Sequence, residues 1–422
     1  MRLTLLAAAT IAALLAAPAA AQLRGHGGPV RAVAASPDGR LAISGGFDST
    51  AILWALAENR ALGVLRLHDD AVTAVAALPD GRFVTAGADG RIALWRLGAR
   101  APERVAQAHK AQIAGLAASP DGRRLASASF DRSLRVEDVE SGAAQIFEGH
   151  RDVVNAVAFS ADGQTLISGG HDGQLRFTPL AGGAPAIVQM EAPVVALLAL
   201  ADGRALAGRA DGALARIDPA SGRVDEIARL GAPISALARR PDGRVAVAGL
   251  DGTITLVDLA SGRLTPFAAK RAGPVWGLAF AGAELLSAGN DGFVRRYDVA
   301  AGVEIAPAAF AETPEIPAGL RDHPGARVFS ACIACHALQP EEGQRAGPSL
   351  HGLMGRRIAS APGYAYSEAL QGLSIVWTPE TVARLFEIGP TRYTPGTKMP
   401  EQRVVDAADR QALVEFLAQA TR

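Results

Sequence analysis

Both cysteines of the 422-residue chain lie in one short motif, CIACH, which runs from Cys332 to His336. Two thiols and an imidazole at this spacing suit three kinds of chemistry: half of a structural zinc site, a thioredoxin-like redox pair, or covalent attachment of a c-type haem. A zinc site needs four ligands and would have to recruit distant histidines such as His323 or His351. A thioredoxin-like pair needs a βαβ setting.

The residues around this motif are typical of a helix. Residues 324–336 carry Val328, Phe329 and Cys332 at helical spacing, which predicts a helical segment that includes both cysteines. On such a helix, cysteines at i and i+3 project from one face, so both thiols could add to the two vinyl groups of one porphyrin. His336 would then lie beneath the ring. The helical setting disfavours the thioredoxin alternative, and the C-x-x-C-H spacing favours haem.

A haem iron held by one histidine has a sixth position, and a sulfur ligand there raises the reduction potential. The methionines downstream of the motif are Met354 and Met399. Met399 lies in TPGTKMP, residues 394–400, a Pro/Gly loop that suits a side chain presented to the distal face of a haem. A lone methionine is more often core filler than a ligand, so the residues around it have to decide.

Two further helices are predicted after the motif. Thr378 is the expected N-cap of one, with Pro379 at its first position. Asp406 is the expected N-cap of the other, which carries an apolar face from Leu413 to Ala420. Three helices in roughly one hundred residues predict a small all-α domain.

This stretch, from Pro324 to Thr421, resembles the class I cytochromes c of the mitochondrial and bacterial c2 type. After CIACH come, in order, GPSLHGLMGR (347–356), PGYAYSEA (362–369), Trp377 and YTPGTKM (393–399). The resemblance implies a domain that holds one covalently bound haem c. It also implies that Cys332 and Cys335 form the thioethers and that His336 and Met399 are the axial iron ligands.

The resemblance implies roles for other residues of the haem site. The carbonyl of Pro348 would orient the His336 ring, a supporting contact that metal-bound histidines commonly have. Arg356, Tyr366 and Trp377 would reach the haem propionates.

The chain also departs from the family's pattern near the methionine. Leu370 stands where the family commonly has asparagine, and Leu385 or Phe386 stands where it has a tyrosine. His351 is expected at the surface. The resemblance further implies a set of residues that pack the first helix of the domain against the last: Gly325, Phe329 and Phe416.

A different pattern fills residues 25–310. SPDGR at 36–40 recurs in related forms, and a second turn gives an independent count of repeats at intervals of 39 to 42 residues. Within each repeat, short strands alternate with turns, and four strands at this period match one propeller blade. The sequence therefore predicts a seven-bladed β-propeller, with its last strand in residues 302–310. The second-turn aspartates are Asp48, Asp89, Asp131, Asp172, Asp211, Asp251 and Asp291.

The repeats resemble the WD-repeat family, whose blades carry a buried tetrad of His, Ser or Thr, Asp and Trp. The first two blades fit this tetrad, whereas Glu137 and Thr178 replace Trp in blades three and four, which keep His109 and His150. Blades five to seven lack the histidine. Because the histidines recur once per blade, we interpret them as structural rather than as metal ligands. The two complete tetrads are His26, Ser44, Asp48 and Trp54, and His68, Thr85, Asp89 and Trp95.

The remaining composition sets the expected domain boundaries. Residues 1–21 have the layout of a secretory signal peptide, with Arg2 before an apolar run that is short for an uncleaved membrane anchor. The propeller is expected over 22–310 and the cytochrome domain over 325–422. The linker between them, 311–324, is rich in proline and spans at most about 40 Å, so the second domain should stay near the propeller without being fixed on it. No transmembrane segment is expected in the mature chain.

The sequence predicts an exported, periplasmic electron carrier rather than an enzyme. The 42 basic and 42 acidic residues balance, so nothing favours a nucleic-acid partner. The propeller shows no catalytic constellation and is expected to be a docking scaffold for a redox partner protein. Two alternatives stay open: an enzyme whose propeller oxidises a small substrate and passes electrons to the haem, or a haem-based sensor. The partner, the direction of electron flow, the potential and the oligomeric state are not predictable from these residues.

Overall fold

The structure of the protein is a computed structural model that describes residues 22–240, 242–267, 273–305, 316–330, 332–333, 335–340, 345–399 and 402–422. The predicted signal peptide, residues 1–21, and the first part of the predicted linker, residues 311–315, lie outside the described residues. Within the described residues, no helix is both long and apolar enough to cross a membrane.

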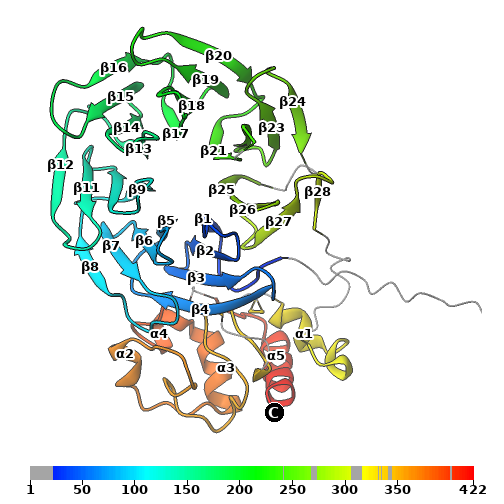
Figure 1. Ribbon diagram of the computed structural model, residues 1–422. Coiled ribbons are helices and arrows are strands. Elements are labelled where there is room, and N and C mark those ends of the chain that lie inside the picture. The colour runs from blue at the N-terminus through cyan, green and yellow to red at the C-terminus, as the bar shows by residue number, and fades with distance from the viewer. Residues whose placement is uncertain are drawn as a thin grey trace, which may run out of the picture.

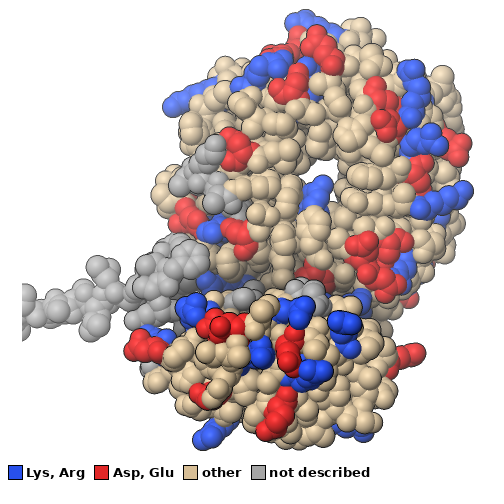
Figure 2. Space-filling model, turned by 180° about the vertical axis from the view of Figure 1, so that it is seen from behind, with Lys and Arg blue, Asp and Glu red and all other residues tan. Residues whose placement is uncertain are grey.

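Four-stranded antiparallel sheets form a ring of seven blades around a central opening, as the repeats predicted (Figures 1 and 2). In each blade the strands follow one another from the centre of the ring outward. The first strand of each blade contacts the first strand of the next, and β25 contacts β1 and closes the ring. The strands of blades one to four are β1 (Val30–Ala35), β2 (Leu41–Gly46), β3 (Thr50–Ala55), β4 (Arg60–Arg66), β5 (Val72–Ala77), β6 (Phe83–Gly87), β7 (Arg91–Trp95), β8 (Arg104–Gln107), β9 (Ile113–Ala118), β10 (Arg124–Ser129), β11 (Leu134–Asp138), β12 (Ala144–Phe147), β13 (Val154–Phe159), β14 (Thr165–Gly170), β15 (Gln174–Pro179) and β16 (Ala186–Gln189).

The same arrangement continues through blades five to seven, although their sequences lack the histidine. The strands are β17 (Val194–Ala199), β18 (Ala205–Arg209), β19 (Ala213–Ile217), β20 (Val224–Arg229), β21 (Ile234–Arg239), β22 (Arg244–Gly249), β23 (Ile254–Asp258), β24 (Leu264–Phe267), β25 (Val275–Ala281), β26 (Glu284–Gly289), β27 (Val294–Asp298) and β28 (Val303–Glu304). The last strand lies within the predicted range. In addition, Leu23 forms a β-bridge with Val294, so the first described residues also help to close blade seven.

Buried hydrogen bonds support the structural interpretation of the histidines. In blade one, His26 Nε2 lies 2.7 Å from Ser44 Oγ, and Trp54 Nε1 donates to the same hydroxyl at 2.8 Å. His26 Nδ1 lies 3.1 Å from the Asp48 carboxylate. Each such histidine is held by residues of its own blade, and among the described residues no three His, Cys, Asp or Glu side chains form a metal site. The histidines therefore fix the turns of the blades.

The C-terminal domain consists of short helices around one core (Figure 1). Thr378 caps α3 and Asp406 caps α5 through hydrogen bonds to backbone N–H groups, as predicted. The rings of Phe329 and Phe416 are fully buried, with centroids 5.3 Å apart, which confirms that the first helix packs on the last. The described elements are η1 (Ala318–Leu320), α1 (Pro324–Phe329), α2 (Glu368–Gln371), α3 (Pro379–Ile388), α4 (Pro390–Tyr393) and α5 (Ala407–Ala420).

One expectation about this domain was wrong: the cysteines do not lie within a regular helix. Helix α1 ends at Phe329, and Cys332 and Cys335 lie in the hydrogen-bonded turns that follow. Cys332 N–H donates to Phe329 O at 2.7 Å, which is an i−3 bond, and among the described residues after Ser330 the next i−4 bond is that of His336, whose N–H donates to Cys332 O at 3.0 Å. After Phe329 the backbone changes to tighter i−3 hydrogen bonding and then makes one helix-like turn. This turn is sufficient to bring Cys332, Cys335 and His336 to the same cavity.

The helical domain contacts the propeller. It lies beside the outermost strand of blade one, β4, in Figure 1. The contact is carried by hydrogen bonds between residues nearly 300 positions apart in the sequence, such as Arg66 and Arg345. The helical domain lies near the propeller, as expected. The expectation that it would not be fixed on the propeller did not include the hydrogen bonds that join the two domains.

Candidate functional site

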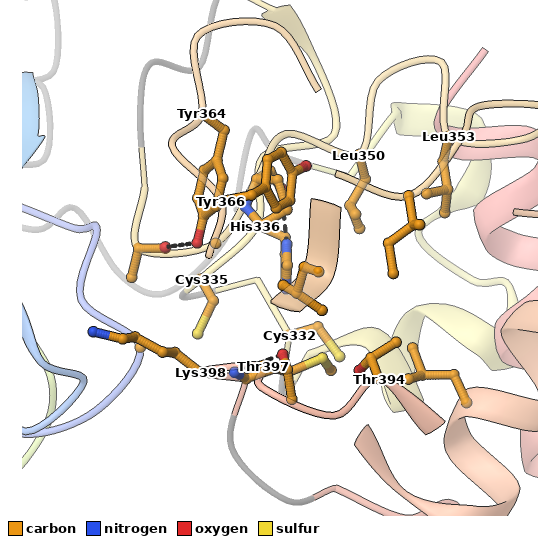
Figure 3. Close-up of a pocket in the computed structure, with 18 of the residues that line it drawn as sticks. Cys332, Cys335, His336, Leu350, Leu353, Tyr364, Tyr366, Thr394, Thr397 and Lys398 are labelled. Carbon is orange, nitrogen blue, oxygen red and sulfur yellow. Dashed lines mark hydrogen bonds between the residues drawn. The ribbon is translucent and has the colours of Figure 1, made fainter. Parts of the chain in front are cut away.

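A cavity in the C-terminal domain brings the predicted site residues together. Its empty space, including the open mouth, is about 1360 Å³. Most of the lining is apolar and comes from the CIACH turn, the following loop and helices α3 and α5. Figure 3 shows the thiols of Cys332 and Cys335 and the ring of His336 pointing into it. The predicted site residues that line the cavity are Cys332, Cys335, His336, Pro348, Arg356, Tyr366, Trp377 and Met399.

The two thiols lie in a dry environment. Burial raises the pKa of Cys332 to about 11. Burial, together with the nearby carboxylate of Asp48, raises the pKa of Cys335 to about 12. Reactive redox pairs need the opposite, a thiol whose pKa is lowered toward neutrality. The environment therefore does not suit the thioredoxin-like alternative.

The two histidines that a zinc site would have to recruit do not lie beside the cysteines. His323 caps α1, where its Nδ1 accepts a hydrogen bond from the Gly325 N–H at 3.0 Å. His351 is exposed, as expected. Neither histidine lines the cavity that holds Cys332 and Cys335.

His336 is held in the orientation that a metal ligand needs. Its Nδ1 lies 2.8 Å from the carbonyl oxygen of Pro348, and because a carbonyl only accepts, Nδ1 carries the proton. The lone pair is therefore on Nε2. Burial lowers the pKa of the ring, so the imidazole is neutral. A side chain on Gly347 would lie 2.5 Å from His336 Cε1, so glycine is required behind the ring.

Met399 reaches the cavity from a loop. The chain leaves α4 at Tyr393, and Met399 N–H donates to Thr397 Oγ1 at 3.1 Å. The methionine is partly buried and packs against the domain core. The other candidate, Met354, packs against the core without lining the cavity. The structure thus places Met399, not Met354, where a ligand could be.

The polar residues at the cavity are fixed by backbone contacts. Arg356 donates to the carbonyls of His351 at 2.8 Å and Ser349 at 2.7 Å. Trp377 N–H donates to Arg356 O at 2.9 Å, which joins the two segments. The ring of Tyr366 contacts that of Tyr364 in a tilted arrangement, with centroids 4.5 Å apart and an angle of 55° between the ring planes.

The residues at which the sequence departs from the family's pattern also line the cavity. Leu370, Leu385 and Phe386 make that part of the wall apolar. Leu385 and Phe386 are buried. The side chains at these three positions cannot form hydrogen bonds near Met399, so they contribute apolar packing to this part of the cavity wall instead.

Sequence reasoning missed the residues that the propeller contributes. Gly27, Asp48, Thr50 and Arg66 line the same cavity although they belong to blade one. The sequence assigns Asp48 only to a blade turn and to the tetrad of blade one. Nothing local in the sequence marks these residues, since their role comes from a contact between the two domains.

The donor set and the lining fit a covalently held haem. Two thiols three residues apart, a neutral imidazole and a methionine sulfur lie around one apolar cavity. Ligand pockets of this kind are mostly apolar, with a few fixed polar groups. The apolar lining of the cavity and the chemistry of its donor residues therefore both suit a covalently bound haem.

Comparisons with known proteins divide the chain in the same way. The family described as "WD domain, G-beta repeat" matches residues 19–55, 59–96, 101–136 and 143–177, the repeats that keep the histidine. The family "Cytochrome c" matches residues 323–421.

Similar proteins are found for the C-terminal part. Cytochrome c of Cochliobolus lunatus is 40% identical over 99 residues, which cover 23% of this chain and 91% of that protein. Cytochrome c of Arabidopsis thaliana is 39% identical over 99 residues, 23% of this chain and 88% of the relative. Cytochrome c type-1 of Ascaris suum is 38% identical over 107 residues, 25% and 91% of the two chains.

These findings define a two-domain protein, a WD-repeat propeller followed by a haem-binding electron-transfer domain. Through its C-terminal domain the chain belongs to the cytochrome c family, with covalently bound haem c as its cofactor. The propeller is of a type used for protein interaction.

Proposed function

We propose that the protein is an exported, periplasmic monohaem electron carrier whose propeller serves as a docking scaffold for a redox partner. The observation that carries this proposal is the convergence of Cys332, Cys335, His336 and Met399 on one apolar cavity. The bound haem supplies a one-electron Fe(III)/Fe(II) couple. The propeller, a fold used for protein interaction, supplies the surface for a partner.

Each residue has a defined part in this proposal. Cys332 and Cys335 would hold the haem through thioethers, and His336 would bind the iron through Nε2 because Pro348 fixes the proton on Nδ1. Met399 would supply a second protein ligand to the iron. With two protein ligands bound, the iron would have no free site for a substrate or a gas, which would suit electron transfer.

Other residues of the cavity set the surroundings of the haem. The resemblance implies that Arg356, Tyr366 and Trp377 reach the propionates. The Arg356 side chain is already held by the carbonyls of His351 and Ser349, which is compatible with this role because little rearrangement would be needed. The lining includes the apolar side chains of Leu353, Leu385 and Phe386. An apolar, buried setting is one of the factors that set a haem potential.

The test is to produce the full chain in a host that matures c-type cytochromes. Intact mass should show one covalent haem and a chain that starts at Gln22, recovered from the periplasmic fraction. The reduced protein should not bind carbon monoxide. Rapid carbon monoxide binding would favour the sensor alternative, and a second organic cofactor or a non-haem metal in the purified protein would favour the enzyme.

A further inference from the structure

The mouth of the cavity is covered by the propeller on the side of Cys335. A Cβ atom at Gly27 would lie 2.4 Å from Cys335 Sγ, so the backbone of blade one touches the thiol directly. Next to it, the Ala346 N–H donates to Gly25 O at 2.8 Å. No side chain fits between the two domains at this point.

Arg66, at the end of β4, holds this contact. One of its terminal nitrogens donates to the carbonyls of Arg345 at 2.6 Å and Ala346 at 3.0 Å. Its guanidinium lies over the Tyr364 ring, 4.0 Å from the centroid, a favourable cation–π arrangement. Its Nε is buried and has no hydrogen-bond partner among the described residues. Arg66 therefore contacts Ala346 and Tyr364, two residues of the C-terminal domain that line the cavity.

Lys398 makes a second contact between the domains. It is the residue before Met399, and its Nζ donates to the carbonyl of His68 in the propeller. The same Nζ lies 3.9 Å from Asp69 Oδ1. Figure 3 shows Lys398 pointing away from the cavity toward the propeller. Both the CIACH side and the methionine loop are therefore bound to blades one and two.

We propose that the propeller is a built-in cover of the haem edge that carries the Cys335 thioether. This inference rests on the proposed function. A protein donor passes one electron to Fe(III) and gives Fe(II), and the rate of such a transfer falls steeply with the distance between the two redox centres. As long as Gly27, Arg66 and Lys398 are in contact as described, a partner protein cannot approach this edge, so electron exchange waits for the cover to open.

Among the described residues, the contact includes hydrogen bonds from Ala346, Arg66 and Lys398, and polar bonds of this kind fit an interface that opens. Interfaces between domains of one chain resemble transient protein–protein interfaces. The contact at Lys398 is half exposed, with 44% of the side chain accessible. The cover can therefore form and break without unfolding either domain.

The first test is a zero-length cross-link in the haem-loaded full chain. The sequence holds three lysines, Lys110, Lys270 and Lys398, so few products are possible. A carbodiimide should join Lys398 to Asp69 with loss of one water, and the Lys398→Gln variant should lose this product. The cross-linked protein should be reduced at least roughly tenfold more slowly by a soluble ferrous cytochrome c, while its rate with hexaammineruthenium(II) should change less than about twofold.

The second test removes the clamp. Arg66→Ala should raise the ratio of the rate with the ferrous cytochrome to the rate with the small reductant roughly tenfold, since two hydrogen bonds and the ring contact are lost. Arg229 is the matched control. In the sheet of blade five it lies opposite Ala213, as Arg66 lies opposite Thr50 in blade one. Its ion-pair partners, Glu226 and Asp211, both belong to the propeller. Arg229→Ala should leave both rates unchanged.

The outcomes separate this inference from the proposed function. If the haem spectrum is normal, three results would overturn the proposed cover and leave the electron carrier intact. They are the absence of a Lys398–Asp69 cross-link, a cross-link that leaves the rate with the ferrous cytochrome unchanged, and equal rates with that donor for Arg66→Ala and the parent. A slower Arg66→Ala variant would also overturn it, because the contact would then assist transfer. If Arg66→Ala fails to load haem, the cross-link result decides.

Discussion

At the scale of single residues, the site depends on the surroundings of His336. The Pro348 carbonyl fixes the proton on Nδ1, Gly347 leaves room for the ring, and burial keeps the imidazole neutral. Each condition favours coordination of a metal through Nε2. The CIACH motif alone predicts the ligand, whereas the structure adds the reasons why this histidine is ready to bind.

Met399 gives the prediction that belongs to this scale. Met399→Ala should lower the reduction potential by on the order of 100 mV or more, because a thioether ligand favours the ferrous state. The variant should also lose the long-wavelength ferric absorption band of sulfur-ligated haem and should bind carbon monoxide when reduced. Met354→Ala, which changes a methionine outside the cavity, should keep both the band and the potential.

Residue identities could be predicted where the chemistry is local. Both cysteines, His336 and Met399 follow from motifs and resemblance, and the structure brings all four to one cavity. Arg66 and Asp48 could not be predicted, since their side chains meet the cavity only after two separate domains pack together. The turn aspartates look alike in all seven repeats, so the sequence does not show which of them lies against the second domain.

At the scale of elements, the packing of α1 on α5 leaves no free volume at Gly325. An added Cβ would lie 2.0 Å from Ala412 O and 2.5 Å from Phe416 Cβ. Gly325→Ala should therefore destabilise the cytochrome domain by about 2–3 kcal/mol, as overpacking of a tight contact does. Chemical unfolding followed by haem absorption measures this. Gly319→Ala, in η1 with nothing within 4 Å, should stay within about 0.5 kcal/mol of the parent.

The turn of blade three gives a pH-dependent prediction. Burial alone would raise the pKa of Asp131, but hydrogen bonds from Ser133 and from the Lys110 N–H outweigh it and lower the pKa to about 2. Because the pKa is lower in the folded state, the stabilisation is complete above the unfolded value of about 4 and is lost as the pH falls through about 2.

Asp131→Asn should therefore lower the free energy of unfolding by about 1–2 kcal/mol at pH 7, a figure reduced for partial exposure. The difference from the parent should shrink toward zero near pH 2. Thermal unfolding followed by far-ultraviolet circular dichroism at both pH values measures it. Glu148→Gln, the same charge change at an exposed position between β12 and β13, should have little effect at either pH; equal effects of the two substitutions would contradict the account.

Element boundaries were predictable where capping residues mark them. Thr378 and Asp406 begin their helices as expected, because each supplies an oxygen to a free backbone N–H. The end of α1 was not predictable. The apolar spacing continues through Cys332, yet the backbone tightens after Phe329, and side-chain spacing does not report such a change of hydrogen bonding.

At the scale of the whole molecule, the seven-fold repeat was predictable and the joining of the domains was not. Regular turns every forty residues or so fix the blade count even where the tetrad is lost, because the turns and the apolar strands suffice to form each sheet. The contact of blades one and two with the cytochrome domain depends on a few side chains far apart in sequence, such as Arg66 and Lys398. Basic and acidic residues are interspersed over both domains, so overall charge does not indicate this contact (Figure 2).

An optical redox titration of the haem-loaded protein decides whether the chain is a His336/Met399 electron carrier. We expect a single one-electron transition at positive potential, with the long-wavelength ferric band of a methionine-ligated haem present throughout the oxidised range. A low potential with that band missing would mean that Met399 is not bound to the iron and that the protein is not this electron carrier.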